Sequence, residues 1–439
     1  MTRVIDMAGK AFSNWSRAHV EHATAQLHDS PAWSAFRRKA FAAFESLPFE
    51  NATYGLDIRS DTSRLDWNAL LFDTSPTAPF SHDLGQGAVM CDLSTAFARF
   101  PAQVEAHLCK QLRLEEKMEA LHATFLSHGV FIYLPPHAKL LQPIVLSDVL
   151  GKYSRLDHVL VLAEEGSSAS ILQEIHSGST SPPASPSAST SAPVQPIFHS
   201  SVMEVVARAH ASIRIGKLQD LPASGVFHFS MVRADVGEGA SVHMEWAEFG
   251  AEFGKSEYAS SLLAPHASSS NVGVMLLSAS QQLDAHQSVR HIAPRTRSSL
   301  LSRGCLGGQS KCIYRGLIRM EKSATMSKGK QACDLLLLSP QAEADPVPAL
   351  EILNSDVSCS HAATVGRLDE EKLFYIASRG VSDAVARSMV IAGFYEHALA
   401  HFSMPELKAK CQSLVQQRLG LDAYSFAGSP PLALQEVKA

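Results

Sequence analysis

The chain has 439 residues, of which 46% are hydrophobic and 18% are charged, and its formal net charge is -5. These values describe a soluble globular chain with ample material for a core, of roughly two or three structural units by length. Because the charge is slightly negative and no segment forms a basic block, nucleic acid and anionic membranes are not expected as partners.

The first residues lack a basic stub followed by an apolar run, and acidic residues occur early, at Asp6 and Glu21. We therefore expect neither a signal peptide nor a transit peptide, and no apolar run is long enough for a membrane helix. The cysteines are odd in number and lack CxxC spacing, which favours a reducing compartment and a cytoplasmic location over a disulfide framework. They are Cys91, Cys109, Cys305, Cys312, Cys333, Cys359 and Cys411.

Residues 1–128 are predicted to form a helical domain. Apolar residues recur at spacings of three and four in SPAWSAFRRKAFAAFESL and FPAQVEAHLCKQLRLEEKMEALHATFL. Ser30 followed by Pro31 suits the cap and first turn of a helix.

Residues 129–366 consist of short runs rich in Val, Ile, Leu and Phe, separated by small-residue turns. Turn sequences recur near positions 209, 239, 267, 296 and 324, roughly 28 to 30 residues apart, which is typical of a solenoid. Short strands and corners without a helix predict a parallel β-helix, in which neighbouring turns bury each other's apolar faces. A β-sandwich is the alternative, because periodicity in one sequence does not fix the topology.

Within this region, residues 177–196 are almost devoid of bulky apolar side chains and are predicted to form a disordered Ser/Pro-rich loop. A helical pattern returns in residues 367–439, which we expect to form a C-terminal helical domain. Asp369 suits a helix N-terminus, Gly380 suits its exit, and Ser382 suits the start of the next helix.

Cys359 and His361 lie at the junction between the strand-rich and helical regions. A thiolate is a natural ligand of iron–sulfur clusters and an imidazole can replace one, so the pair could bind a metal. Two ligands do not complete a tetrahedral site, and the others would come from elsewhere, most simply another subunit. Taken alone, the residues favour a small buried cysteine and a histidine that hydrogen-bonds a turn. The other cysteines are expected to pack in the core.

Residues 286–303 contain six cationic or titratable side chains that could bind an anion, although the lack of a Gly-rich phosphate loop favours an ordinary polar face. They are His286, Arg290, His291, Arg295, Arg297 and Arg303. No nucleotide-binding or nucleophile motif occurs in its required context, so nucleotide hydrolysis by this chain is not expected. A polysaccharide-active β-helix enzyme would need clustered carboxylates on one solenoid face, and no such cluster is evident.

From about Gly129 to about His397, the order of segments resembles the SufB/SufD family, the scaffold subunits of the Suf iron–sulfur cluster assembly system. The matching segments are GVFIYLPPHAKLLQPIVL, HVLVLAEEGSSASILQE, HQSVRHIAPRTRSSLLSRG, IYRGLIRMEKSAT, EILNSDVSCSHAATVGRLDEEKLFYIASRGVS and SMVIAGF. The chain is more similar to SufD than to SufB, because it lacks a cysteine-rich N-terminal segment. It also has no cysteine between Cys109 and Cys305, where SufB carries a sulfur-accepting one.

The resemblance implies a mainly β fold, with a right-handed parallel β-helix flanked by N- and C-terminal α-helical domains. It implies a non-enzymatic scaffold that pairs with a SufB homologue through the β-helices. The C-terminal helical domain, in the region Leu373 to Phe394, would dock the SufC ABC-type ATPase. His361, with Cys359 beside it, would be a metal ligand of a transient iron–sulfur cluster at the SufB interface, and no other cofactor is expected.

Alternatives and one departure accompany this resemblance. The chain could be a SufB-branch paralogue that is itself the cluster scaffold, since the run around Cys333 partly resembles that branch, or a purely structural β-helix protein. Unpaired strands could produce a homodimer of the isolated chain. Ala362 stands where the motif usually has Gly, which restricts the backbone after His361.

Overall fold

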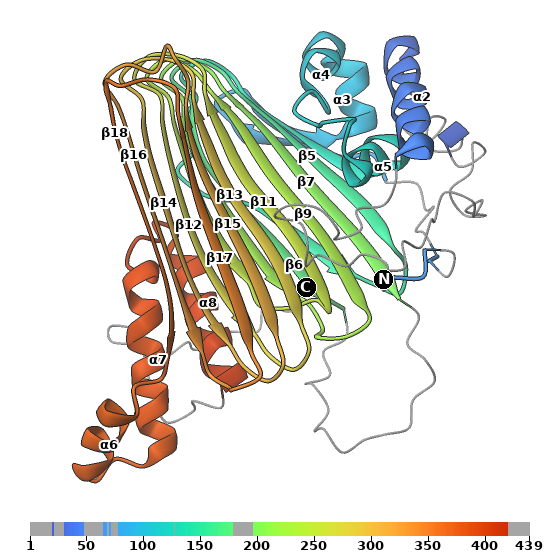
Figure 1. Cartoon of the computed structure of the whole chain (residues 1–439). Coiled ribbons are helices and arrows are strands. Elements are labelled where there is room, and N and C mark those ends of the chain that lie inside the picture. The colour runs from blue at the N-terminus through green and yellow to red at the C-terminus, as the bar shows by residue number, and fades with distance from the viewer. Residues whose placement is uncertain are drawn as a thin grey trace.

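The computed structural model describes residues 20–21, 30–47, 65–67, 70–71, 78–126, 128–178 and 196–419. Most of them belong to a β-solenoid of about eight turns, in which each full turn adds one strand to each of two sheets (Figure 1). The strands of the solenoid pair in parallel, which confirms the predicted β-helix and excludes the β-sandwich.

The two sheets differ in size. The ten-stranded sheet contains, in spatial order, β1 (Ser81–Gly85), β2 (Ala88–Asp92), β3 (His128–Leu134), β5 (Arg155–Ala163), β7 (Ile197–Ala207), β9 (Val226–Val236), β11 (Phe253–Leu262), β13 (Gln282–His291), β15 (Lys311–Met320) and β17 (Glu343–Ile352). The eight-stranded sheet contains β18 (Val357–Arg367), β16 (Ser327–Leu337), β14 (Arg297–Leu306), β12 (Ser268–Leu277), β10 (Ser241–Glu248), β8 (Ser212–Asp220), β6 (Ser168–Ser177) and β4 (Ile144–Leu150). The strands from β6 onward are 8 to 11 residues long, so they are longer than the short strands predicted.

The corners of the solenoid repeat with the predicted period. One residue in the left-handed backbone region marks the same corner in successive turns, at His210, Gly239, His266, Arg295 and Met326. Each of these residues donates its backbone N–H to a carbonyl of the next turn, as His210 does to Glu238 at 2.7 Å and Met326 does to Asp356 at 2.7 Å. The predicted turn positions therefore correspond to real corners, and the hydrogen-bond ladder continues through them.

The interior of the solenoid is filled by the inward-facing side chains of both sheets. Trp246 of β10 stacks on Tyr258 of β11 across the interior, with ring centroids 4.7 Å apart. Gly273 of β12 makes room for this indole, because a Cβ atom there would lie 2.0 Å from the Trp246 ring. The alternation of inward and outward side chains thus produces a close-packed core between the sheets.

The N-terminal region contains four described helices: α2 (Pro31–Ser46), α3 (Leu93–Arg99), α4 (Pro101–His107) and α5 (Lys117–Phe125). They bury an aromatic cluster against the outer face of the ten-stranded sheet, near β5, β7 and β9 (Figure 1). Ser30 Oγ accepts a hydrogen bond from the Trp33 N–H, which confirms the predicted cap of α2. The buried Arg37 donates to the carbonyls of Thr124 and Leu126, both at 2.9 Å, and so ties α2 to α5.

Part of this region is not helical, contrary to the helical domain expected for residues 1–128. β1 and β2 form an antiparallel hairpin that extends the ten-stranded sheet beyond β3. The turn between them has positive φ at Gly85, Gln86 and Gly87. The glycines supply this conformation, and pairing with β3 stabilises a strand that a helical periodicity analysis misses.

The C-terminal helices are α6 (Glu370–Ser378), α7 (Asp383–Leu399) and α8 (Pro405–Leu419). Asp369 caps α6, Gly380 has φ +86°, and Ser382 precedes α7, as predicted. None of these three predictions required information from distant residues.

Helices α7 and α8 fold back over the eight-stranded sheet (Figure 1). The hydroxyl of Tyr395 donates to the Met275 carbonyl of β12 at 2.6 Å. The hydroxyl of Ser403 donates to Glu245 of β10 at 2.5 Å, and Arg418 pairs with Asp220 at the end of β8. The segment from α7 to α8 therefore contacts β12 first, then β10 and then β8, which is the reverse of their order along the chain.

The predicted loop connects β6 to β7, and its residues 179–195 lie outside the described part of the chain. Among the described helices, none combines the length and apolar character needed to cross a bilayer.

Candidate functional site at the open end of the solenoid

The last two strands are the terminal strands of their sheets. Among the described strands, β17 pairs only with β15 and β18 pairs only with β16, so within this part of the chain each strand has one unpaired edge. The two strands contact each other, which places both free edges at the same end of the solenoid. Such edges present rows of unpaired backbone N–H and C=O groups, which are templates for pairing with another chain.

Cys359 and His361 lie on β18, and the register shows which way they face. Cys359 is opposite Gly329 of β16, and His361 is opposite Gln331. Because Gly329 and Gln331 are buried, this side of the strand faces the interior of the solenoid. Cys359 packs half-buried against the interior core, whereas His361 is exposed at its open mouth. The structure therefore brings the two predicted ligands together on one side of a terminal strand.

The pair does not form a complete metal site within the described residues. The described His, Cys, Asp and Glu side chains include no third residue close enough to form a metal-binding group with Cys359 and His361. Burial raises the pKa of the Cys359 thiol, partly offset by a backbone hydrogen bond from Gly329. A metal that binds this sulfur must therefore displace a proton at neutral pH.

Gln331, which sequence analysis did not identify, lies beside His361 in the register of β16 and β18. Its amide is buried, and neither its Nε2 nor its Oε1 has a hydrogen-bond partner among the described residues. Gly316 gives it room, since a Cβ atom there would lie 1.8 Å from Nε2. An unpartnered buried amide is costly, and this one adds polar character to the mouth next to His361.

Ala362 continues β18 in the extended conformation and is not among the residues with positive φ. The strand therefore has no need of the glycine that usually occupies this position.

The outward side of β18 borders a different feature. Ser358 and Ser360 line an open groove of about 470 Å³ that crosses the eight-stranded sheet, together with Arg297, Lys328 and Lys330. No carboxylate of the described residues forms an ion pair with these three cations. The groove is thus a positively charged surface on the face opposite to Cys359 and His361.

The cationic residues of 286–303 do not gather in one anion site. Arg290 pairs with Glu321 at 2.7 Å, and Arg303 pairs with Asp334 at 2.9 Å. Only Arg297 of this set lines the groove. The interpretation as an ordinary polar face therefore holds for most of the segment.

The other six cysteines are all buried, as predicted for core residues. They are Cys91, Cys109, Cys305, Cys312, Cys333 and Cys411.

Comparison with known proteins decides the family. Residues 150–394, which include β18, α6 and most of α7, match the family described as SUF system FeS cluster assembly, SufBD core domain. This chain belongs to the SufBD family. The match contains both residues of the candidate site and the strands that position them.

Similar SufBD family proteins occur in staphylococci. The chain is 30% identical over 289 residues to the iron–sulfur cluster assembly SufBD family protein of Staphylococcus epidermidis, covering 64% of this chain and 58% of that protein. The corresponding proteins of Staphylococcus haemolyticus and Staphylococcus aureus are each 29% identical over 289 residues, with the same coverage. The chain thus spans a little over half the length of the SufBD relatives it matches.

Proposed function

We propose that this SufBD protein is a SufD-type scaffold subunit, which pairs with a SufB homologue and contributes His361 to the nascent iron–sulfur cluster. The observation that carries this proposal is the position of His361 beside Cys359 on an unpaired terminal strand. The cluster is cargo in this function, assembled on ligands from two chains and then passed on. Cys359 would be a secondary or supporting ligand.

Pairing through the β-helices is supported by the unpaired edges of β17 and β18 and by apolar side chains beside them. Ile352, Leu353 and Val365 are exposed at this end. Another β-strand edge would satisfy the backbone groups and cover these side chains. In the absence of SufB, the same edges could pair with a second copy of this chain.

Docking of an ATPase of the SufC type is supported by the surface of α6. Phe374 and Tyr375 are 77% and 59% exposed, although Leu373 beside them is buried. Adjacent exposed aromatic side chains favour a binding surface over an ordinary solvated helix. ATP-driven movement of the partner would act on α6 and α7 and shift the pairing of the β-helices. In this function the chain is a scaffold and the ATPase performs the hydrolysis.

The SufD branch is favoured over SufB because no cysteine occurs between Cys109 and Cys305, so the earlier turns offer no thiol to accept sulfur. A cytoplasmic location belongs to the same proposal and is supported by the odd number of cysteines, all free in the described structure.

The test is anaerobic co-purification of this chain with the SufB and SufC homologues of its own cell. We compare wild type with His361→Ala, and use His82→Ala as the matched control because His82 is exposed on β1 of the other sheet. The expected result is an intact complex that loses the visible absorbance of the cluster only in His361→Ala. A complex that never forms would contradict the scaffold function, and an unchanged cluster would contradict the role of His361.

The docking surface has its own test. Phe374→Glu is expected to abolish retention of the ATPase on the immobilised chain while pairing with the SufB homologue persists. Equal retention by wild type and variant would remove α6 from the proposed interface.

A further inference from the structure

The cationic groove on the outer face of the eight-stranded sheet has no role in the proposed function. It is lined by residues near the start of β10, β12, β14, β16 and β18, and no aspartate or glutamate is among them. Its main apolar lining residue, Val242, belongs to the interior core. Arg297, Lys328 and Lys330 are therefore surrounded mainly by serine hydroxyls, with the imidazole of His243 beside them.

The register of the sheet brings the three cations together. Arg297 of β14 is directly opposite Lys328 of β16, and neighbouring strands lie about 4.8 Å apart. Lys330 lies two residues further along β16 on the same side, about 6.6 Å away. All three side chains are exposed. Because like charges opposite each other destabilise a sheet, this arrangement favours the binding of an anion.

Other cations of the same region have carboxylate partners within the chain. Arg303, further along β14, pairs with Asp334 of β16 at 2.9 Å. Lys311 of β15 pairs with Glu343 of β17 at 2.9 Å. The groove differs, because no carboxylate of the described residues forms an ion pair with its three cations. The counter-charge must therefore come from a ligand or from solvent ions.

The contacts of the C-terminal helices lie further along the strands. They reach Glu245, the fifth residue of β10, and Met275, the eighth residue of β12. The groove instead uses the first three residues of each of these strands. Its volume of about 470 Å³ lies within the range of small-ligand sites.

We propose that this groove binds a small phosphate compound, with a diphosphate group as the unit that it recognises. The guanidinium group of Arg297 can form two parallel hydrogen bonds with phosphate oxygens, and Lys328 and Lys330 supply two further positive charges. Ser299 and Ser360 are the neighbours of Lys330 on β14 and β18, and their hydroxyls can donate to the remaining oxygens. A diphosphate carries several negative charges on two adjacent phosphoryl groups, which suits three cations in one patch.

The lining also indicates which part of a phosphorylated molecule is recognised. No Phe, Tyr or Trp lines the groove, so the described lining offers no aromatic ring of this kind for a nucleobase to stack on. Pyrophosphate and the diphosphate of ADP should therefore bind with similar affinity. An acidic protein segment is disfavoured for the same reason, because protein interfaces depend on aromatic and apolar anchors.

This site is independent of the proposed function, since Cys359 and His361 face the opposite side of β18. The formal net charge of the chain is -5, so the groove is a local positive feature of a slightly acidic protein. Of the cationic segment 286–303, only Arg297 takes part. The interpretation as an ordinary polar face is thus revised at this one residue.

The experiment is isothermal titration calorimetry of the full chain with sodium pyrophosphate. We expect one pyrophosphate per chain, and affinities about tenfold lower in Lys328→Gln and in Lys330→Gln, because each change removes a charge-assisted hydrogen bond. The matched control is Lys311→Gln, which removes the same charge from an exposed position of the other sheet and should leave the affinity unchanged. Circular dichroism confirms that each variant is folded.

A variant that keeps all three cations gives a second readout. Ser299 is directly opposite Lys330, so Ser299→Asp supplies this ammonium group with a carboxylate partner. We expect Ser299→Asp to abolish pyrophosphate binding, whereas Ser299→Asn, of the same size but without the charge, should retain it. ADP should bind the wild type as tightly as pyrophosphate, and orthophosphate more weakly, because it has a single phosphoryl group.

Three results would overturn the site. The first is folded wild-type protein that does not bind pyrophosphate at millimolar concentration. The second is an equal loss of affinity in Lys328→Gln, Lys330→Gln and Lys311→Gln, which would assign the binding to overall charge. The third is a peptide of eight glutamates that binds more tightly than pyrophosphate, which would assign the groove to an acidic protein segment.

Discussion

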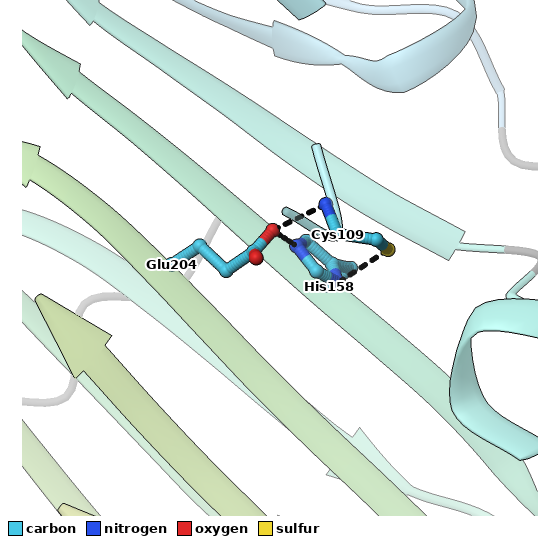
Figure 2. Close-up of side chains that lie close together, drawn as sticks. All are labelled: Cys109, His158 and Glu204. Atoms are coloured by element: carbon cyan, nitrogen blue, oxygen red, sulfur yellow. Dashed lines mark hydrogen bonds and ion pairs between the residues drawn. The ribbon is translucent and has the colours of Figure 1, made fainter. Parts of the chain in front are cut away.

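The chain places cysteine and histidine together in two regions, and the surroundings of the two pairs are opposite. Cys109 and His158 lie under helices, with the carboxylate of Glu204 holding both of them. Cys359 and His361 lie on a terminal strand, and His361 is open to solvent. The first group is therefore closed by hydrogen bonds within the chain (Figure 2), whereas the second pair lies where another chain could reach it.

The largest effect that would test this contrast is on stability. Glu204→Ala should lower the free energy of unfolding by about 3–5 kcal/mol, because it leaves His158 and two backbone N–H groups buried without their acceptor. His361→Ala should change it by less than about 0.5 kcal/mol. Urea denaturation followed by circular dichroism measures both values. Equal losses in the two variants would show that the regions do not differ as described.

Thiol reactivity is the next contrast. Cys359 should react with iodoacetamide on the order of 100-fold faster than the six buried cysteines, which must wait for local opening. Because burial raises the pKa of Cys359, its rate should rise about tenfold per pH unit near neutrality. Mass spectrometry of the native protein identifies the modified residue. First modification at Cys305 or Cys411 would contradict the burial pattern.

A smaller effect is expected at the edge of the eight-stranded sheet. Val365→Lys places a charge on β18, where Val365 is 43% exposed, and should weaken pairing with a SufB homologue about tenfold, or 1.4 kcal/mol. The matched control is Val145→Lys, because Val145 is 51% exposed on β4, the other terminal strand of the same sheet. Sedimentation of the mixed subunits measures both affinities. The prediction fails if the two variants pair equally well.

The smallest predicted effect concerns acid. Burial lowers the pKa of His291 to about 4, so the folded state keeps this imidazole neutral while the unfolded chain binds a proton near pH 6.5. The free energy of unfolding should therefore decrease as the pH is lowered. The contribution of His291 to this decrease is about 1 kcal/mol between pH 6.5 and pH 5.5. His291→Asn, compared with wild type at each pH, should remove that part of the decline. An unchanged slope would show that the folded and unfolded states protonate His291 equally, so that burial does not lower its pKa.

The repeat and the edge pair were accessible from sequence because their signals are local. Turn sequences near positions 209, 239 and 267 correspond to corners at His210, Gly239 and His266. A helix start predicted at Asp369 indicated where the solenoid ends, and thus placed Cys359 and His361 near that end. That both residues lie on its last strand, β18, is seen in the structure.

The hairpin and the buried polar group around Glu204 were not accessible in the same way. β1 and β2 are stabilised by pairing with β3, which no local pattern reports. Cys109, His158 and Glu204 come from separate segments, and only the stacking of turns brings them together. One signal was available: His158 and Glu204 interrupt strands that are otherwise largely apolar, and polar residues at such positions require a partner.

The return path of α7 and α8 has a mechanical consequence. The segment from α7 to α8 is attached to three successive turns of the solenoid through Tyr395, Ser403 and Arg418, and it runs across these turns along the solenoid axis. A force applied to α6 would act on these three turns as a unit, because α7 and α8 link them and oppose the separation of one turn from the next. The last strand, β18, lies beyond these three attachment points. The turns that contain β8, β10 and β12 would then stay fixed relative to each other, while the end of the solenoid at β18 moves relative to them.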